Sequence, residues 1–272
     1  MFEAKLEKAD LWRKVIEAMK DLVQEATLDC TDNGISLQAM DNAHVSLVCL
    51  LLRSDGFLEY RCDRNVSLGL NIARYINYHY SNFSSTAKIL KCAGSTDSIT
   101  IRAADRADTV SFVFESENNE KVSEFSIKLM DLDVDHLGIP DSVNYKSIIK
   151  LPAAEFRRIC SDLAQIGDSV VISVSKNDVC FNASGDLGSG NIRLTQTANA
   201  DKPEDAVVVD MTEPVSMTYS LQYLNYFTKA TPLSGQVSLS LSDNVPAEIQ
   251  YTIPDLGYMR FYLAPKIEDD DN

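Results

Sequence analysis

The chain has 272 residues, of which 45% are hydrophobic and 24% charged, and this composition excludes disordered, fibrous and collagen-like proteins. It carries 25 Lys and Arg residues against 40 Asp and Glu residues, a formal net charge of −15. Because such a charge repels nucleic acid, DNA binding would require a local basic face. The length predicts two domains, since a single hydrophobic core seldom organises so long a chain.

The sequence gives no sign of a membrane span or a secretory signal. The longest apolar run, Val45 to Leu52, is interrupted by Ser46 and is far shorter than the roughly 20 residues that a membrane-spanning helix needs. The first residues alternate charged and apolar side chains. We therefore expect an intracellular protein without a membrane partner, whose six cysteines are free thiols, mostly buried.

An internal repeat becomes visible when the sequence is compared with itself at a separation of 144 residues. Trp12-Arg-Lys-Val-Ile16 then aligns with Phe156-Arg-Arg-Ile-Cys160, and both stretches have the spacing of an amphipathic helix. Alternating strand patterns follow each helix, so that residues 28–39 align with residues 172–183. The two halves of the chain are therefore expected to share one fold.

Each half continues with a hairpin, further strands and a second helix. The hairpin turns are predicted at Asn33-Gly34, with the positive φ of a type I′ turn, and at Asn177-Asp178. Alternation from Val45 to Leu51 predicts a half-buried strand, and second helices are predicted near Lys88–Lys91 and Leu221–Phe227. Two helices on one face of an antiparallel sheet make an α+β layer domain, so the sequence predicts this domain twice.

The expected organisation is an N-terminal domain at 1–128, a connector at 129–146, a C-terminal domain at 147–266 and an acidic tail at 267–272. In the connector, Asp131, Asp133 and Asp135 imitate the opening of a calcium-binding loop, but His136 and Ser142 stand where that loop needs Gly and Glu. We therefore expect no metal and no cofactor. An uncharacterised enzyme with a repeated α+β fold is the weakest of three hypotheses for function.

Basic residues gather on the predicted helices. Arg13 and Lys20 share one stripe of the first helix, opposite an apolar stripe, and Arg157 and Arg158 repeat this pattern in the second half. The other two helices carry or adjoin Lys88, Lys91 and Lys229. A solvated surface explains any single base, but the agreement of four helices favours a local nucleic-acid face.

Long runs along the whole chain occur in the order typical of one known family. They include Met1-Phe-Glu-Ala-Lys-Leu6, Leu37-Gln-Ala-Met-Asp41, Lys88-Ile-Leu-Lys-Cys-Ala-Gly94, Leu137-Gly-Ile-Pro140 and Leu263-Ala-Pro-Lys-Ile267. The chain thus resembles the proliferating cell nuclear antigen family of eukaryotic sliding clamps. The resemblance implies the DNA clamp fold and a head-to-tail homotrimeric ring, with helices around a central hole and edge strands at Glu120–Ile127 and Asp186–Leu194 pairing between subunits.

The function that the resemblance implies is that of a nuclear sliding clamp. The ring would encircle double-stranded DNA, act as processivity factor for the replicative DNA polymerase and dock the clamp loader, flap endonuclease, DNA ligase and other replication, repair and translesion-synthesis proteins. The positions that match the family's channel-facing bases are Arg13, Lys14, Lys20, Lys88, Lys91, Lys121, Arg158 and Lys229. Ser161, Gln165 and Gln222 stand where relatives often carry a base or His, which predicts a weaker DNA contact in the second domain.

Client proteins of the family insert a Gln-x-x-aliphatic-x-x-aromatic-aromatic motif into a pocket beneath the connector. The matching positions would give the aromatic anchors an apolar socket and a backbone edge. They are Met40, His44, Val45, Leu47, Leu137, Ile139, Pro140, Pro246, Tyr262, Ala264, Pro265 and Lys266. For Leu47 and Tyr262, core packing is an equally good explanation. Lys176 matches the family's ubiquitin-accepting lysine.

The chain departs from the family at residues 75–85, an apparent insertion before the helix that carries Lys88 and Lys91. Two explanations stay open: a retained intron or mispredicted gene model, which we favour, and a real loop that narrows the channel or adds a contact. A divergent checkpoint-type clamp subunit is the alternative function. Such a paralogue would not be expected to keep both Leu137-Gly-Ile-Pro140 and Ala264-Pro-Lys266.

Overall fold

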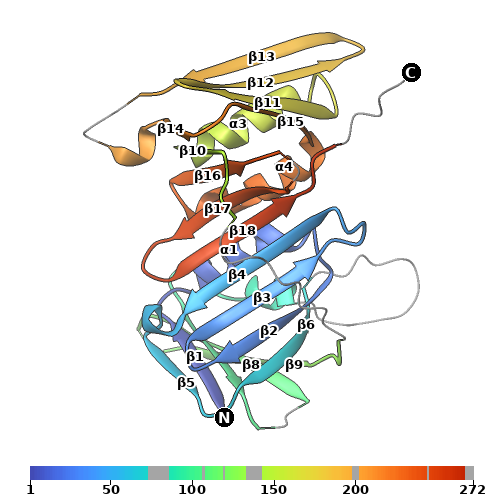
Figure 1. Ribbon diagram of the computed structural model, residues 1–272. Coiled ribbons are helices and arrows are strands. Elements are labelled where there is room, and N and C mark those ends of the chain that lie inside the picture. The colour runs from blue at the N-terminus through green and yellow to red at the C-terminus, as the bar shows by residue number, and fades with distance from the viewer. Residues whose placement is uncertain are drawn as a thin grey trace. The chain divides into compact units, whose positions relative to one another are not determined.

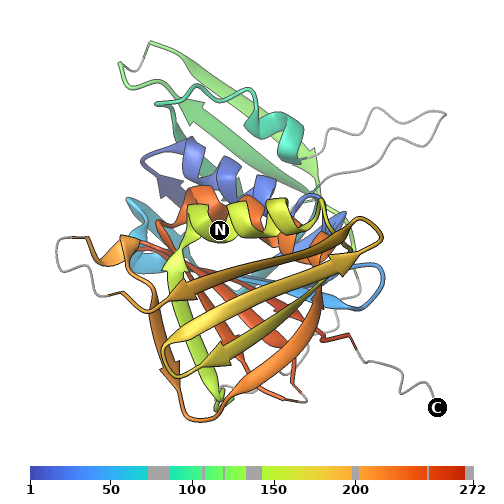
Figure 2. The same cartoon turned by 90° about the horizontal axis from the view of Figure 1, so that it is seen from above.

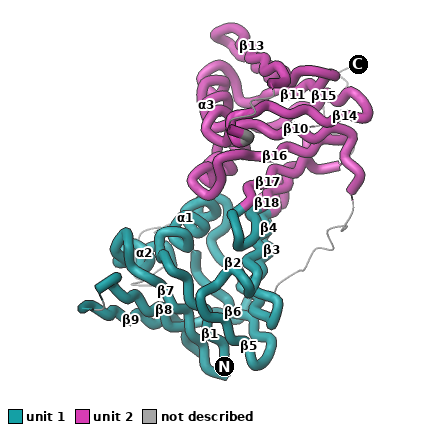
Figure 3. Tube along the Cα trace, turned by 90° about the vertical axis from the view of Figure 1, so that its left-hand side faces the viewer, with its two compact units in different colours: residues 1–42, 48–137, 253–259 teal, residues 43–47, 138–252, 260–272 magenta. Residues whose placement is uncertain are grey.

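The computed structural model describes residues 1–72, 86–105, 108–118, 120–132, 143–197, 202–243 and 245–266. The chain forms two compact units (Figure 3). Unit 1 comprises residues 1–42, 48–137 and 253–259, and unit 2 comprises residues 43–47, 138–252 and 260–272. Each unit therefore consists mostly of one half of the sequence and includes a short segment of the other half. The predicted domain bounds, 1–128 and 147–266, stay a prediction.

The first half of the chain folds into two antiparallel sheets and two helices (Figure 1). One sheet has the strand order β5-β1-β7-β8-β9, and the other strands lie in the order β4-β3-β2-β6. The elements are β1 (Phe2–Leu6), α1 (Ala9–Met19), β2 (Glu25–Thr31), β3 (Gly34–Met40), β4 (Ser46–Arg53), the 3₁₀ turn η1 (Ser54–Gly56), β5 (Glu59–Cys62), β6 (Val66–Asn71), α2 (Thr86–Leu90), β7 (Ser98–Ala103), β8 (Thr109–Glu115) and β9 (Val122–Lys128).

The second half repeats this arrangement, with strand orders β14-β10-β16-β17-β18 and β13-β12-β11-β15. Its elements are β10 (Ser147–Pro152), α3 (Ala153–Leu163), β11 (Ser169–Ser175), β12 (Asp178–Gly185), β13 (Gly188–Thr195), η2 (Pro203–Asp205), β14 (Val208–Met211), β15 (Val215–Ser220), α4 (Leu221–Phe227), η3 (Thr228–Leu233), β16 (Gln236–Leu241), β17 (Ala247–Ile253) and β18 (Gly257–Leu263). Every strand and helix of the first half thus has a counterpart in the second, in the same order. The predicted repeat and the α+β class are confirmed.

The helices bury the stripes that the sequence predicted. Trp12 and Ile16 of α1 are at most 1% exposed, and their counterparts in α3, Phe156 and Cys160, are equally buried. Within unit 1, α1 packs beside α2, and within unit 2, α3 packs beside α4 (Figure 2). None of the helices in the described part of the chain is long and apolar enough to cross a membrane.

The two halves differ in length between the sixth and seventh strands of each repeat. The interval from the start of β6 at Val66 to the start of β7 at Ser98 is 32 residues. The counterpart interval, from Val215 of β15 to Gln236 of β16, is 21 residues. The first half therefore carries 11 more residues here, which is where the insertion at residues 75–85 was predicted. Those residues lie outside the described part of the chain.

Both predicted hairpins form, but each turn lies one residue earlier than predicted. Thr31 pairs with Gly34, so the first turn is Asp32-Asn33, and neither of its residues has a positive φ. The prediction of a type I′ turn is therefore wrong. The second turn is likewise Lys176-Asn177, because the flanking residues on either side pair with each other.

Gly34 is required for a different reason, namely the close approach of β3 to β4. Its φ is +142°, a conformation that residues with a side chain rarely adopt. A Cβ at this position would lie 2.1 Å from the carbonyl oxygen of Leu52. Glycine therefore satisfies both the backbone conformation and the space left by β4.

Strand β4 is buried on both faces, so the prediction of a half-buried strand is wrong. Val48 and Leu50 are at most 2% exposed, although they point opposite to Leu47 and Cys49, which are 9% and 7% exposed. The apolar run at residues 47–52 is typical of a strand covered on both sides. The prediction assumed that every second residue faces solvent, and this assumption does not hold for β4.

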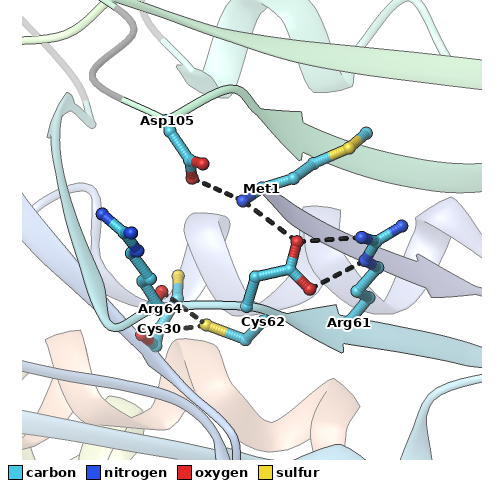
Figure 4. A network of polar contacts seen from close by, with 7 residues as sticks. Met1, Cys30, Arg61, Cys62, Arg64 and Asp105 are labelled. Atoms are coloured by element: carbon cyan, nitrogen blue, oxygen red, sulfur yellow. Dashed lines mark hydrogen bonds and ion pairs between the residues drawn. The ribbon is translucent and has the colours of Figure 1, made fainter.

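The start of β1 is held in the five-stranded sheet by ion pairs (Figure 4). The Met1 ammonium contacts the carboxylate of Asp105 and lies 3.4 Å from that of Asp63. Asp63 also accepts two hydrogen bonds of 2.9 Å from the Arg61 guanidinium, which lowers the pKa of its carboxyl group. These groups are exposed, so they align β1 with β5 rather than contribute much stability.

All six cysteines carry free thiols, as predicted. Three of them, Cys30, Cys49 and Cys160, are buried, while Cys62 and Cys180 are half-buried and Cys92 is exposed. Burial raises the pKa of Cys30 and of Cys160 well above the usual range of a thiol. These two thiols therefore act as small apolar side chains of the core.

Replacement of Gly34 with Ala is expected to destabilise the protein more than replacement of Gly188, whose φ is +139°. Both changes impose backbone strain of about 1–3 kcal/mol. Only at Gly34 does the new Cβ meet backbone, because nothing lies within 4 Å at Gly188. Urea denaturation should therefore give a free energy of unfolding lower by a further ~2 kcal/mol for Gly34→Ala. Equal losses in the two variants would contradict the close-approach explanation.

Candidate functional site

The predicted DNA-facing bases are placed by the helices of each unit. In unit 1, Arg13 and Lys14 lie on α1 and Lys88 lies on α2, while in unit 2 Arg158 lies on α3. Others directly follow a helix: Lys20 follows α1, Lys91 follows α2, and Lys229 lies in η3 behind α4. Lys121 is exposed and stands apart from the helices, immediately before β9. The structure therefore groups seven of the eight bases with the helices.

On α1, carboxylates of the helix itself pair with the bases. Arg13 contacts Asp10, and the Lys14 ammonium lies 2.9 Å from the same carboxylate. The hydrogen bond from Lys14 is the main cause that lowers the pKa of Asp10. Lys20 contacts Glu17. The positive charges of α1 are thus largely balanced within the helix.

The same pairing occurs on α3, where the Arg158 guanidinium lies 3.6 Å from the Asp162 carboxylate four residues later. Both side chains are more than half exposed. Exposed pairs of this kind are worth about 0–1 kcal/mol, so a phosphate group can compete for the base at little cost. The helices therefore offer bases that bind anions weakly and exchangeably.

Helix α4 carries a polar cluster that includes a tyrosine which sequence reasoning missed. The Gln222 amide donates a hydrogen bond of 3.0 Å to the Tyr226 hydroxyl, and the Lys229 ammonium lies 5.2 Å from the centre of the Tyr226 ring. Asn225 donates a 3.2 Å hydrogen bond to the Cys160 carbonyl and so fixes α4 against α3. Residues 222, 226 and 229 are spaced by four and three, a helical signal that identifies the cluster.

Two strands end the sheets of their units and expose apolar side chains. β9 is the last strand of the five-stranded sheet in unit 1, and β13 is the last strand of the four-stranded sheet in unit 2. Val122, at the start of β9, is 63% exposed, and Leu187, just before β13, is 88% exposed. Both segments lie where the resemblance implied pairing edges. An exposed edge with apolar side chains is typical of a strand that pairs with another chain.

The repeat gives β9 and β13 the counterparts β18 and β4. Within unit 1, the Arg53 amide at the end of β4 donates a hydrogen bond of 2.8 Å to the Leu256 carbonyl before β18. Within unit 2, the Ala264 amide donates a 3.2 Å hydrogen bond to the Val45 carbonyl. The chain itself therefore contains a backbone pairing of the kind that β9 and β13 leave open.

Some of the predicted client-binding residues come together in unit 2. The hydrogen bond between Ala264 and Val45 joins the segment after β18 to the loop before β4, and Val45 is 36% exposed. His44, next to it, is exposed and has a positive φ of 55°. At the other side of this segment, the Lys266 amide donates a 2.8 Å hydrogen bond to the Thr218 carbonyl. The segment at residues 264–266 is therefore held at both ends.

Two other predicted client-binding residues are part of the core. Leu47 and Tyr262 are each 9% exposed. The Tyr262 hydroxyl donates a 2.9 Å hydrogen bond to Glu248, and burial raises the pKa of Tyr262. Pro246 and Ala264 are exposed, and Met40 and Pro265 are half-buried. Leu137, Ile139 and Pro140 lie outside the described residues, so their place in the pocket stays a prediction.

Lys176 lies in the turn between β11 and β12 and is exposed. The predicted hairpin is thus present, and the ammonium is accessible to a modifying enzyme. Nothing in the hairpin itself selects this lysine for ubiquitin. Its role as an acceptor remains an expectation from the resemblance.

Comparison with protein families agrees with this architecture. The model described as "Proliferating cell nuclear antigen, N-terminal domain" matches residues 1–137, and the model described as "Proliferating cell nuclear antigen, C-terminal domain" matches residues 138–266. The two matches meet inside the predicted connector. Clamps of this family are generally non-enzymatic scaffolds that bind DNA and replication and repair proteins and form multimeric rings. The chain belongs to the proliferating cell nuclear antigen family of DNA sliding clamps.

Proposed function

We propose that the protein is a homotrimeric sliding clamp of the nucleus, which encircles duplex DNA and acts as processivity factor for the replicative DNA polymerase. The observation that carries this proposal is the pair of open edges, β9 and β13. Their counterparts, β18 and β4, are joined by backbone hydrogen bonds within the chain. Pairing of β9 with β13 of the next chain would repeat that junction, and three chains with two units each would close a ring.

A closed ring explains why an acidic protein with paired bases can act on DNA. Topology keeps the ring on the duplex, so the bases need not hold a phosphate for long. Asp10, Glu17 and Asp162 balance the bases of α1 and α3, which favours brief contacts along the duplex. The ring can therefore slide, which is what processivity requires of a clamp.

The docking role is supported by the segment at residues 264–266 and the exposed Val45 beside it. A client peptide could pair with this backbone and place its aromatic anchors against the apolar side chains. The proposed clients are the polymerase, the clamp loader, flap endonuclease, DNA ligase and translesion-synthesis proteins. Ubiquitin on Lys176 would regulate the last of these.

The oligomeric state is the first test of the proposal. Light scattering after gel filtration should give a mass of about 91 kDa, three times the chain mass of 30.2 kDa. Val122→Glu places a charge on the β9 edge and should shift the mass towards 30.2 kDa on dilution, whereas Val208→Glu on β14 should leave the trimer intact. A stable monomer of the parent chain would instead favour a checkpoint-type clamp subunit that needs other chains.

Removal of the acidic partners of the helix bases should strengthen the contact with DNA. The triple variant Asp10→Asn, Glu17→Gln and Asp162→Asn is expected to bind a short linear duplex more tightly. Each freed base adds up to one phosphate contact, so the slope of log K against log salt should steepen by up to ~0.9 per base.

A variant of equal net charge serves as the control for this experiment. It neutralises exposed carboxylates of strands β2, β5 and β14, with Glu25→Gln, Glu59→Gln and Asp210→Asn. Binding should be measured by fluorescence anisotropy over a series of salt concentrations. If both triple variants gain the same affinity for DNA, net charge rather than the helix face determines binding.

The docking segment is tested with a peptide that carries the Gln-x-x-aliphatic-x-x-aromatic-aromatic motif. Val45→Ala removes two methyl groups from the socket and should weaken binding about five- to tenfold. Val208→Ala, which changes a valine of similar exposure on β14, should leave the affinity unchanged. Ile139→Ala should also weaken binding with the trimer intact. Isothermal titration calorimetry measures all four proteins, and unchanged affinity in both socket variants would refute the assignment.

A further inference from the structure

The two repeats differ in the exposure of one equivalent aliphatic residue. Leu58 immediately precedes β5, and its counterpart Val207 immediately precedes β14, each two residues after a 3₁₀ turn, η1 or η2. Leu58 is 60% exposed, whereas Val207 is 8% exposed. An aliphatic side chain is therefore covered in unit 2 and uncovered in unit 1.

In unit 2, Val207 pairs with another residue of the same chain. The Thr197 amide donates a 3.0 Å hydrogen bond to the Val207 carbonyl, and the two residues form an isolated antiparallel bridge. Thr197 belongs to the stretch at residues 196–202, between the end of β13 and the start of η2. In unit 1, β4 ends at Arg53 and η1 begins at the next residue, so this stretch has no counterpart in the sequence.

Two cavities meet at Leu58 in unit 1. The more apolar one has a volume of about 300 Å³ and is lined by Leu6, Leu11, Phe57, Pro254 and Leu256 among others. The second has a volume of about 360 Å³ and extends past Thr96 and Ser98 to the end of β8. Leu58, Glu7 and Lys8 line both cavities, so the two form one groove along the start of β5.

The rim of this groove has more negative than positive charge. The Lys5 ammonium lies 2.7 Å from the Glu115 carboxylate, so these two charges balance each other. The hydrogen bond from Lys5 is the main cause that lowers the pKa of Glu115. Of the remaining lining residues, Glu7, Glu117 and Asp255 are acidic and Lys8 is basic. A basic side chain would complement this rim.

The backbone at Leu58 can accept the same bond as that at Val207. The Leu58 amide already donates to the Lys5 carbonyl, at 2.9 Å. Glu59 pairs with Lys5 as Val208 pairs with Lys150, so the Leu58 carbonyl corresponds to the Val207 carbonyl, which accepts the hydrogen bond from Thr197 in unit 2. In the described part of the chain β5 is the edge strand of its sheet, so a further strand can be added there.

We propose that this groove binds an extended segment of a partner protein. The segment pairs with the carbonyl of Leu58, as residue 197 pairs with Val207, inserts an aliphatic side chain beside Leu58, and places a Lys or Arg against the acidic rim. The site lies wholly in unit 1 and is distinct from the docking segment around Val45. It does not depend on ring formation or on DNA.

The test is a selection of short random peptides on the full-length protein, after depletion on the Leu58→Glu variant. Enriched peptides should combine an aliphatic residue with Lys or Arg, and calorimetry should show at least about tenfold weaker binding to Leu58→Glu. Val208→Glu, the matched change beside the counterpart position in unit 2, should bind them as the parent does, and so should Val45→Ala. Glu117→Lys should weaken basic peptides and spare neutral ones.

Light scattering and thermal denaturation of Leu58→Glu should match the parent, because the side chain is mainly exposed. Three results would overturn the proposal: no enrichment over the depleted pool, equal binding to Leu58→Glu, or enriched peptides that Val45→Ala releases. A fourth result would also overturn it: the parent protein associates further as its concentration rises, and Leu58→Glu abolishes this association. The groove would then belong to a contact between copies of the chain. These peptide-binding measurements can be interpreted even if light scattering shows that the protein is not a trimer.

Discussion

The strongest constraint on this fold is the need to pair the edges of its sheets. Each unit is built from short antiparallel strands, and an edge strand leaves a row of backbone donors and acceptors without a partner in its sheet. The chain meets this need between β4 and β18 by hydrogen bonds at both ends. The same need remains at β9 and β13, whose ends expose Val122 and Leu187. A repeated fold in which β9 and β13 correspond to the two strands of its own internal junction can form a closed ring by head-to-tail pairing.

The charge pattern fits a protein that holds DNA by enclosure rather than by affinity. A net charge of −15 opposes binding, and the helix bases share their charge with carboxylates such as Asp10 and Asp162. A conventional DNA-binding protein would lose affinity through such pairs, because its binding depends on the release of counterions from phosphates. A ring that slides benefits from these ion pairs because they weaken its contacts with phosphate, and every strong contact would have to break before the ring could move. The acidic composition, which at first excludes DNA binding, is therefore compatible with a clamp.

Much of the fold could be predicted from spacing alone, because helix cores recur at fixed intervals. Trp12 and Phe156 occupy equivalent buried positions for that reason. Local signals failed where a neighbouring strand decides the conformation. Gly34 indicated a type I′ turn, but glycine is needed there because β4 approaches closely. For β4, the alternating pattern predicted one exposed face, whereas the strand is covered on both faces. The site was harder to predict, since exposure of Val45 and the contact of Lys229 with Tyr226 depend on tertiary packing.

The differences between the repeats are more informative about partners than their similarities. Similar positions, such as the buried stripes of α1 and α3, maintain the common core. Where the halves diverge, one repeat supplies from its own sequence a pairing that the other lacks. Residue 197 pairs with Val207, whereas no residue in the described part of the chain is seen to pair with Leu58 in this way. An exposed aliphatic side chain beside an edge strand favours aggregation unless something covers it. The pairing of residue 197 with Val207 therefore indicates what kind of segment would fit beside Leu58.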